Sequence, residues 1–257
     1  MATIFGHKWD SGNGLKFDGV NDYIEVSKVF ALADIRTVSF WMKASTVNAS
    51  STIVSFGTTG NNNAYAWAYI TVSFNLLVFG YSALNGSPYT RCNISDNLID
   101  GNLHHIVCIF SGNRINNDIT GFKCYVDGIL KIVTNISVVG GSLPTIQGVS
   151  KIGGYPGASG VVRAFYKNYL FDLKVFNKEL SQTEITELYT KQGQIVPSTA
   201  MSSLQLDYRF NNKSSTVLTD KSINGYHGTL MNYAIETTDL GATNSWCDKY
   251  GNALTAY

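Results

Sequence analysis

A row of aromatic residues between positions 64 and 81 has the chemistry to hold a sugar. Tyr65, Trp67 and Tyr69 recur at every second position, so a β-strand would place all three on one face. Flat aromatic rings match the C–H faces of pyranoses, and a stacked sugar is the ligand that such a row favours. The row is equally typical of a buried core, because aromatic side chains also fill protein interiors. The sequence leaves both interpretations open.

The predicted contacts extend from this row to the aromatic residues of the turns and rims that follow it. One lies after a turn at 85–86, and another lies at the tip of a Gly-rich, loop-like stretch at 137–162. The residues that we predict to bind carbohydrate are Trp67, Tyr69, Tyr81, Tyr89 and Tyr155.

Paired carboxylates, which a glycoside hydrolase needs on the two sides of its cleft, are scarce in this chain. Of only five Glu residues, three lie in or beside one predicted helix near the end of the sandwich, and Glu25 and Glu236 each stand alone. The sequence has no alternating Glu/Asp cluster and no nucleophile elbow around a Ser or Cys. We therefore predict that the protein has no catalytic residues and is not an enzyme.

Residues that could bind a metal lack a recognisable ligand set. Asp18 and Asp22 flank a Gly and could attract calcium, but Asp beside Gly more often fixes a turn through its backbone N–H groups. His104 and His105 have no Cys or carboxylate partner at metal-ligand spacing, which favours a structural role. We predict no cofactor, and calcium remains an open alternative without an assignable site.

The elements that would position these residues are short antiparallel strands. The stretch 102–131 predicts strands at 103–111 and 121–126, and a third strand at 129–136 follows a type I′ turn at Asp127-Gly128. Cys108 and Cys124 lie on neighbouring strands, where a bridge is conceivable and two buried free thiols are favoured. Because an alternating strand has one apolar face to cover, a second sheet must pack on the first.

Four blocks of sequence stand out along the chain: GLKFDGVNDYIEV at 14–26, VSFWMK at 38–43, HHIV at 104–107 with YVDG at 125–128, and KIGG at 151–154 with FDLKVFNKELSQTEI at 171–185. In type and order these blocks resemble the laminin-G-like domains of the concanavalin A-like lectin/glucanase superfamily. The resemblance implies an all-β fold: a two-sheet antiparallel jelly-roll sandwich with one short helix near 181–192. It implies no activity, because this fold carries lectins, hydrolases and adhesion modules.

The order of the blocks changes near the C-terminus. Residues 1–196 form the expected sandwich, and Ser181 with Glu184 forms a capping box at the start of the helix. The stretches LQLDYRF at 204–210 and HGTL at 227–230 resemble family strands that normally precede the FDG block. We therefore expect residues 203–257 to complete the sandwich in permuted order, with the strand at Leu204 beside the strand that opens at Gly14, or to pack on a neighbouring subunit.

Charge and hydropathy exclude several classes of partner. The net charge is +1 and no Lys or Arg stripe is present, so we predict no nucleic-acid binding. No apolar stretch is long enough to span a membrane, and the first residues lack the apolar core of a signal peptide. Charged residues make up 14% of the chain. This weak charge indicates either a surface covered by neighbours or one solvated by Asn, Ser and Thr.

These observations together favour a non-catalytic virion surface protein with a lectin-like fold. Virion proteins assemble in the host cytoplasm without an export signal, and a capsid decoration, fibre or tail component touches other virion proteins or copies of itself. We expect host or environmental glycans to be its further ligands. The alternative is a stand-alone carbohydrate-binding lectin module, and a glycoside hydrolase is the remote alternative.

Overall fold

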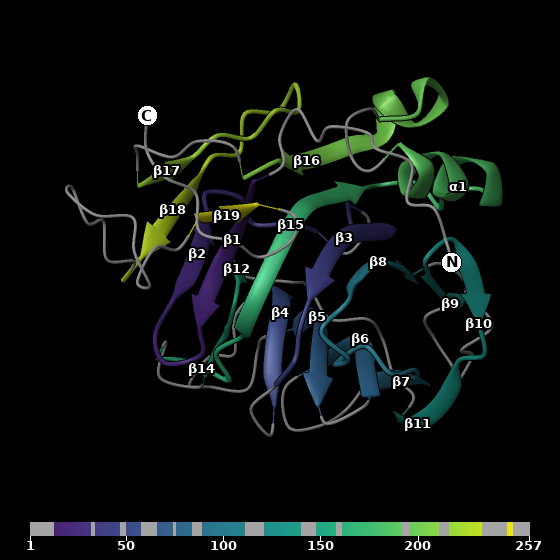
Figure 1. The fold of residues 1–257 in the computed structure, drawn as a ribbon, viewed down its shortest axis with the longest axis horizontal. Coiled ribbons are helices and arrows are strands. Elements are labelled where there is room, and N and C mark those ends of the chain that lie inside the picture. Colours follow the sequence, from purple (N-terminus) through teal and green to yellow (C-terminus); the bar gives the residue numbers. More distant parts are fainter. Residues whose placement is uncertain are drawn as a thin grey trace.

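Two antiparallel sheets pack face to face in a computed structural model of the chain, as Figure 1 shows. The structure describes residues 13–31, 34–46, 50–57, 66–73, 76–83, 89–110, 121–139, 148–157, 161–191, 196–210, 216–232 and 246–248. The predicted all-β sandwich with one short helix is confirmed. In the described residues, no helix is long and apolar enough to cross a membrane.

The first sheet has eight strands. In spatial order they are β10 (Ile129–Lys131), β9 (Phe122–Val126), β8 (Leu103–Phe110), β3 (Thr37–Lys43), β15 (Lys167–Phe176), β1 (Asn13–Asp18) and β19 (Trp246–Asp248), and β16 (Leu204–Tyr208) also pairs with β15. The second sheet has nine strands: β11 (Thr134–Val139), β7 (Tyr89–Ser95), β6 (Leu76–Ala83), β5 (Ala66–Ser73), β4 (Ser51–Phe56), β12 (Ser150–Ile152), β2 (Tyr23–Val26), β18 (Gly228–Met231) and β17 (Val217–Leu218). A separate hairpin joins β13 (Tyr155–Pro156) to β14 (Val162–Arg163).

The β9–β10 hairpin turns through two residues with positive φ, Asp127 at 52° and Gly128 at 79°. The predicted type I′ turn is therefore present. The single strand predicted at 129–136 is wrong, because the chain crosses between the sheets in the middle of it. Residues 129–131 pair with β9 in the eight-stranded sheet, and Thr134 begins β11 in the nine-stranded sheet. An alternating apolar pattern cannot reveal such a crossing, since both halves remain extended.

The core between the sheets is apolar and rich in aromatic rings. Phe79 packs edge-on against Phe110 with ring centroids 5.8 Å apart, and Phe30 packs in the same way against Phe56 at 5.3 Å. Cys108 and Cys124 face each other in register on β8 and β9, buried in this core as free thiols. The prediction of two buried thiols rather than a bridge agrees with this structure.

Helix α1 (Gln182–Thr190) covers part of the outer face of the eight-stranded sheet, the face turned away from the other sheet (Figure 1). Ser181 and Glu184 form the predicted capping box. Ile185 and Leu188 are buried against Val107 and Ile109 of β8, whereas Tyr189 is only half-buried. This sheet therefore has apolar packing on both sides along β8 and β9.

The C-terminal segment supplies strands to both sheets of its own chain. β16 pairs with residues 173–176 of β15, and β18 pairs with β2. β1 pairs with the preceding residues of β15, 167–170, and β3 pairs along the opposite edge. The strand at Leu204, β16, therefore pairs with β15 beyond the end of β1. It does not lie beside β1, where it was expected. The position beside β1 belongs to β19.

Buried charges join β16 to β15. Lys174 is fully buried and contacts the carboxylates of Asp172 and Asp207, the latter at 3.4 Å. Arg209 approaches the other oxygen of Asp207 at 2.9 Å. Asp220 accepts a hydrogen bond from the backbone N–H of Asp207 at 2.8 Å. Buried charges are costly unless paired, so this arrangement fixes the tail strand against β15.

Candidate functional site

The outer face of the nine-stranded sheet carries a continuous cross-strand row of residues. Directly opposed residues of antiparallel strands share one face of a sheet. The row, which we call the outer row, runs from β7 to β17 through Arg91, Gly80, Tyr69, Ser55, Lys151, Glu25, Thr229 and Val217. The adjacent row through Ile70, Phe79 and Cys92 belongs to the core. The outer row therefore faces away from it.

A carboxylate and an ammonium group meet in the middle of the outer row. Lys151 on β12 donates a hydrogen bond to Oε2 of Glu25 on β2 at 2.5 Å. The two side chains differ in exposure, 6% for Lys151 and 43% for Glu25. The buried ammonium therefore fixes the position of a carboxylate that stays open to solvent.

The Tyr23 ring lies beside this pair, and the Phe165 ring lies beside Tyr23. The ammonium of Lys151 lies 5.2 Å from the centroid of the Tyr23 ring, within the range of a cation–π contact. The Tyr23 and Phe165 rings are 6.5 Å apart, and both are half-buried. Burial, and then the negative charge of Glu25, raises the pKa of Tyr23. We call Tyr23, Glu25, Lys151 and Phe165 the Glu25 site.

The Glu25 site has the groups that hold a polar, ring-shaped ligand. The exposed carboxylate can accept hydrogen bonds from hydroxyl groups, and the half-buried aromatic rings can contact C–H groups. The neighbouring hydroxyl of Ser55 is buried and has no hydrogen-bond partner among the described residues. The outer row contains a single carboxylate, whereas glycoside hydrolysis in its usual form needs two. The arrangement therefore has groups that suit binding.

Four of the five aromatic residues predicted from sequence, Trp67, Tyr69, Tyr81 and Tyr89, lie in the same sheet. Trp67 pairs with Ser82, which pairs with Tyr89, so Trp67 and Tyr89 belong to one cross-strand row. Tyr69 belongs to the outer row itself. The side chains of Trp67, Tyr69 and Tyr89 lie outside the described part of the structure, and Tyr65 lies outside it entirely. Their contact with a ligand stays a prediction.

The predicted ligand contact of Tyr81 needs correction. Tyr81 is 2% exposed and packs on Phe122 across the core, with ring centroids 5.9 Å apart. It pairs with Ala68, so it takes the face opposite to that of the outer row. Tyr155 is half-buried on β13 and remains a candidate for a rim contact.

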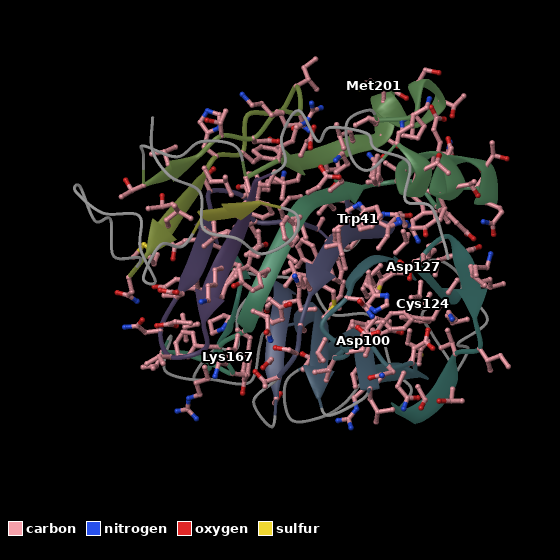
Figure 2. All side chains as sticks on the ribbon, in the orientation of Figure 1. Trp41, Asp100, Cys124, Asp127, Lys167 and Met201 are labelled. Carbon is pink, nitrogen blue, oxygen red and sulfur yellow. The ribbon has the colours of Figure 1, made fainter. Side chains whose placement is uncertain are left out.

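The two adjacent histidines occupy different surroundings on β8. Nδ1 of His104 lies 2.9 Å from Oδ2 of Asp127, and its Nε2 lies 3.1 Å from Oδ1 of Asp100. These contacts, the bond to Asp127 first, raise the pKa of His104. His104 thus has the carboxylate partners that its sequence neighbourhood did not reveal. Figure 2 labels both aspartates on the side of the molecule where β8 and β9 lie.

His105 is buried between the eight-stranded sheet and α1. Its Nε2 lies 2.9 Å from Oγ of Ser39, and its ring packs against both the Trp41 and the Tyr189 rings, with centroids 4.8 and 6.1 Å away. Burial lowers the pKa of His105 to about 3. Ser39 and His105 are each 1% exposed, so this Ser–His contact is closed to a substrate and its role is structural.

Asp18 and Asp22 fix the turn between β1 and β2, as predicted. Oδ1 of Asp18 accepts hydrogen bonds from the backbone N–H groups of Val20, Asn21 and Asp22, and Oδ2 of Asp22 accepts one from the N–H of Asp18. Burial raises the pKa of Asp22 to about 7. Among the described residues, no group of three or more His, Cys, Asp or Glu side chains could hold a metal ion.

Sequence reasoning identified Glu25 as an isolated carboxylate and missed the site around it. Glu25 and Lys151 are 126 positions apart and meet only because β12 lies beside β2 in the sheet. Phe165 follows the β13–β14 hairpin, and its parallel bridge to Thr52 brings it to the same sheet. The alternation of Tyr23 and Glu25 on one face of a strand was the available signal.

A family model described as "Concanavalin A-like lectin/glucanases superfamily" matches residues 18–186. The match covers well over half of the chain, so this protein belongs to that superfamily. No curated protein matches the chain in sequence.

Solved structures with the same fold come from several organisms. A candidate carbohydrate binding protein from Bacteroides ovatus ATCC 8483 has a TM-score of 0.56 at 15% identity, covering 85% of this chain and 58% of that one. This chain therefore spans little more than half of that protein. A heptameric SAP-like pentraxin from Limulus polyphemus has a TM-score of 0.52 at 17% identity, with coverages of 71% and 84%. The CBM40 of a Ruminococcus gnavus IT-sialidase has a TM-score of 0.50 at 11% identity, with coverages of 68% and 97%. At these identities the likeness shows the fold alone.

Proposed function

We propose that this member of the concanavalin A-like lectin/glucanases superfamily is a non-catalytic, glycan-binding protein whose contact surface includes the Glu25 site. The observation that carries the proposal is the Glu25–Lys151 pair, which holds an exposed carboxylate on the outer face of a sheet, next to the Tyr23 ring and its neighbour Phe165. Similar folds in proteins named for carbohydrate binding give it further support.

The charges of the site favour a neutral, hydroxyl-rich glycan. Glu25 is the exposed charge, and it would repel a carboxylated sugar. Lys151 is buried and already paired with Glu25, so it offers little to an anionic ligand. Arg91 is exposed at the β7 end of the outer row. It lies five strand spacings, about 24 Å, from Glu25. Binding of an acidic sugar at Arg91 would therefore use a different part of the sheet from the Glu25 site.

An array of neutral and sialylated oligosaccharides first identifies the glycans that bind the wild-type protein. Calorimetry with those glycans then compares the affinities of two isosteric substitutions. Glu25→Gln removes the charge and an acceptor and should reduce the affinity for neutral glycans at least tenfold. Glu187→Gln makes the same change on helix α1 and should leave the affinity unchanged. Tyr23→Ala should weaken binding by about 1 kcal/mol.

Three results would contradict this proposal. They are the absence of glycan binding by the folded wild-type protein, equal affinities for Glu25→Gln and wild type, and a preference for sialylated glycans that Arg91→Gln abolishes. Release of reducing sugar from a polysaccharide panel would contradict the absence of catalysis.

For the biological setting we propose the surface of a virion, with other virion proteins or further copies of this chain as neighbours. The weak charge of the chain, 14% charged residues, supports a surface that is largely covered in an assembly. Mass spectrometry and immunogold labelling of purified particles would test this setting. Absence of the chain from particles would leave a stand-alone lectin module as the better description.

A further inference from the structure

Strand β10 ends the eight-stranded sheet with an apolar edge. Ile129, Leu130 and the next residue, Ile132, are 63%, 54% and 87% exposed. Proteins usually protect such an edge with charges, Pro or a bulge, because its free backbone groups can pair with another strand. The one charged residue of β10, Lys131, is already bound to Asp96, with its Nζ 2.8 Å from Oδ2.

The hairpin register fixes which backbone groups of β10 point outward. Ile129 pairs with Val126 across the two-residue turn, and Lys131 pairs with Cys124. The pair that closes a two-residue hairpin exchanges hydrogen bonds, and bonded and non-bonded pairs then alternate. Ile129 and Lys131 therefore direct their N–H and C=O groups toward β9. Leu130 directs its groups toward the free edge, and continued alternation assigns Ile132 to that edge as well.

We propose that β10 pairs in antiparallel fashion with β10 of a second copy of this chain, forming one continuous sheet across two subunits. Three registers would match the outward groups. One places Leu130 opposite itself and Ile132 opposite Gly128, and another places Ile132 opposite itself and Leu130 opposite Thr134. The third has its two-fold axis at Lys131. It places Leu130 opposite the partner's Ile132, and Ile132 opposite the partner's Leu130. The third buries the most apolar surface, and we assign it.

The charges and faces of the edge fit this pairing. Lys131 and the partner's Lys131 would lie side by side in a non-hydrogen-bonded pair, each beside an Asp96 carboxylate, so that two cations meet two anions. Leu130 shares a face with Tyr125, to which it is paired. The Leu130 and Ile132 side chains of both copies would therefore form one apolar cluster on that face. This interface is independent of the Glu25 site, which lies on the other sheet.

Cross-linking tests the register. A non-hydrogen-bonded pair holds its Cα atoms about 4.5 Å apart, within the range of a disulfide. In a Cys247→Ser background, Lys131→Cys should therefore give a cross-linked dimer under mild oxidation. Ile223→Cys, a change at a 98% exposed position, should not. Cys92, Cys108 and Cys124 are buried and should stay unreacted.

Sedimentation tests the dimer itself in the complete chain. Wild type should approach twice its mass of 28.1 kDa as its concentration rises, and Ile132→Lys should sediment as a monomer with an unchanged melting temperature. Ile223→Lys, the matched change elsewhere, should dimerise like wild type. A wild-type monomer at the highest soluble concentration would overturn the proposal, as would equal dimerisation of both variants or equal cross-linking of both cysteine variants.

Discussion

The two sheets share one core but use their outer faces differently. On the eight-stranded sheet, α1 covers Val107 and Ile109, and Trp41 stacks on Tyr189 of the helix with ring centroids 5.7 Å apart. Polar groups on this sheet, such as Lys174 and His105, are sealed from water. On the nine-stranded sheet, Glu25 and Thr229 reach solvent from the outer row. The covered face therefore contributes to stability, while the open face presents the polar groups on which the proposed glycan binding depends.

The largest expected effect comes from removing the C-terminal segment, which supplies strands to both sheets. Deleting residues 198–257 takes β16 from β15 and β18 from β2, and it uncovers core residues around Tyr208. We expect an aggregating product without a cooperative thermal transition, measured by calorimetry and light scattering. A soluble monomer with the melting temperature of the full chain would show that the tail is a separate module.

A second prediction makes the same substitution on each face. Lys174→Met leaves Asp172 and Asp207 buried without their ammonium partner and should cost about 3–5 kcal/mol of unfolding free energy. Lys151→Met leaves only Glu25, which is 43% exposed and can be hydrated, and should cost about 1 kcal/mol or less. Urea unfolding measures both values. Equal losses of unfolding free energy for the two substitutions would contradict the difference between the covered and the open outer face.

The two histidines of β8 should respond to pH with opposite signs. The folded-state pKa of His105 is about 3, below the ordinary value of 6.5, so its contribution to stability is lost as pH falls from 6.5 toward 3. The folded-state pKa of His104 is raised, so its contribution is full below pH 6.5 and is lost as pH rises through that pKa. His105→Gln should reduce the loss of stability that wild type shows as pH falls below 6.5. His104→Gln should reduce the loss that wild type shows as pH rises through the pKa of His104. Denaturant midpoints from pH 4 to 8 measure this, and profiles parallel to wild type would contradict it.

The smallest predicted effect lies at Asp22, in the turn that connects the two sheets. Because its folded-state pKa of about 7 exceeds the ordinary value of 3.8, the charged carboxylate opposes folding as pH rises from about 4 to 7. Asp22→Asn keeps the acceptor for the N–H of Asp18 and should gain on the order of 1 kcal/mol at pH 8. At pH 4 the gain should vanish. Glycan affinity, measured in parallel, should stay unchanged because neither outer face is altered.

Local features were predictable because their causes lie within a few residues. The Asp127-Gly128 turn, the Asp18–Asp22 turn and the Ser181–Glu184 capping box all appear where the sequence placed them. The ligand-binding residues were harder to predict, since alternation shows that a strand has two faces without showing which one the second sheet will cover. Tyr81 was therefore assigned to the surface although it lies in the core.

The sequence by itself determined the class of fold and the tight turns, because these follow from residue types at short spacing. Tertiary structure alone decided that Lys151 meets Glu25 across 126 positions and that β16 lies along β15 instead of beside β1. It also decided that the chain changes sheets between Lys131 and Thr134, which leaves β10 as an open edge. Such outcomes depend on which strands become neighbours, and that choice is made by the packing of the whole chain.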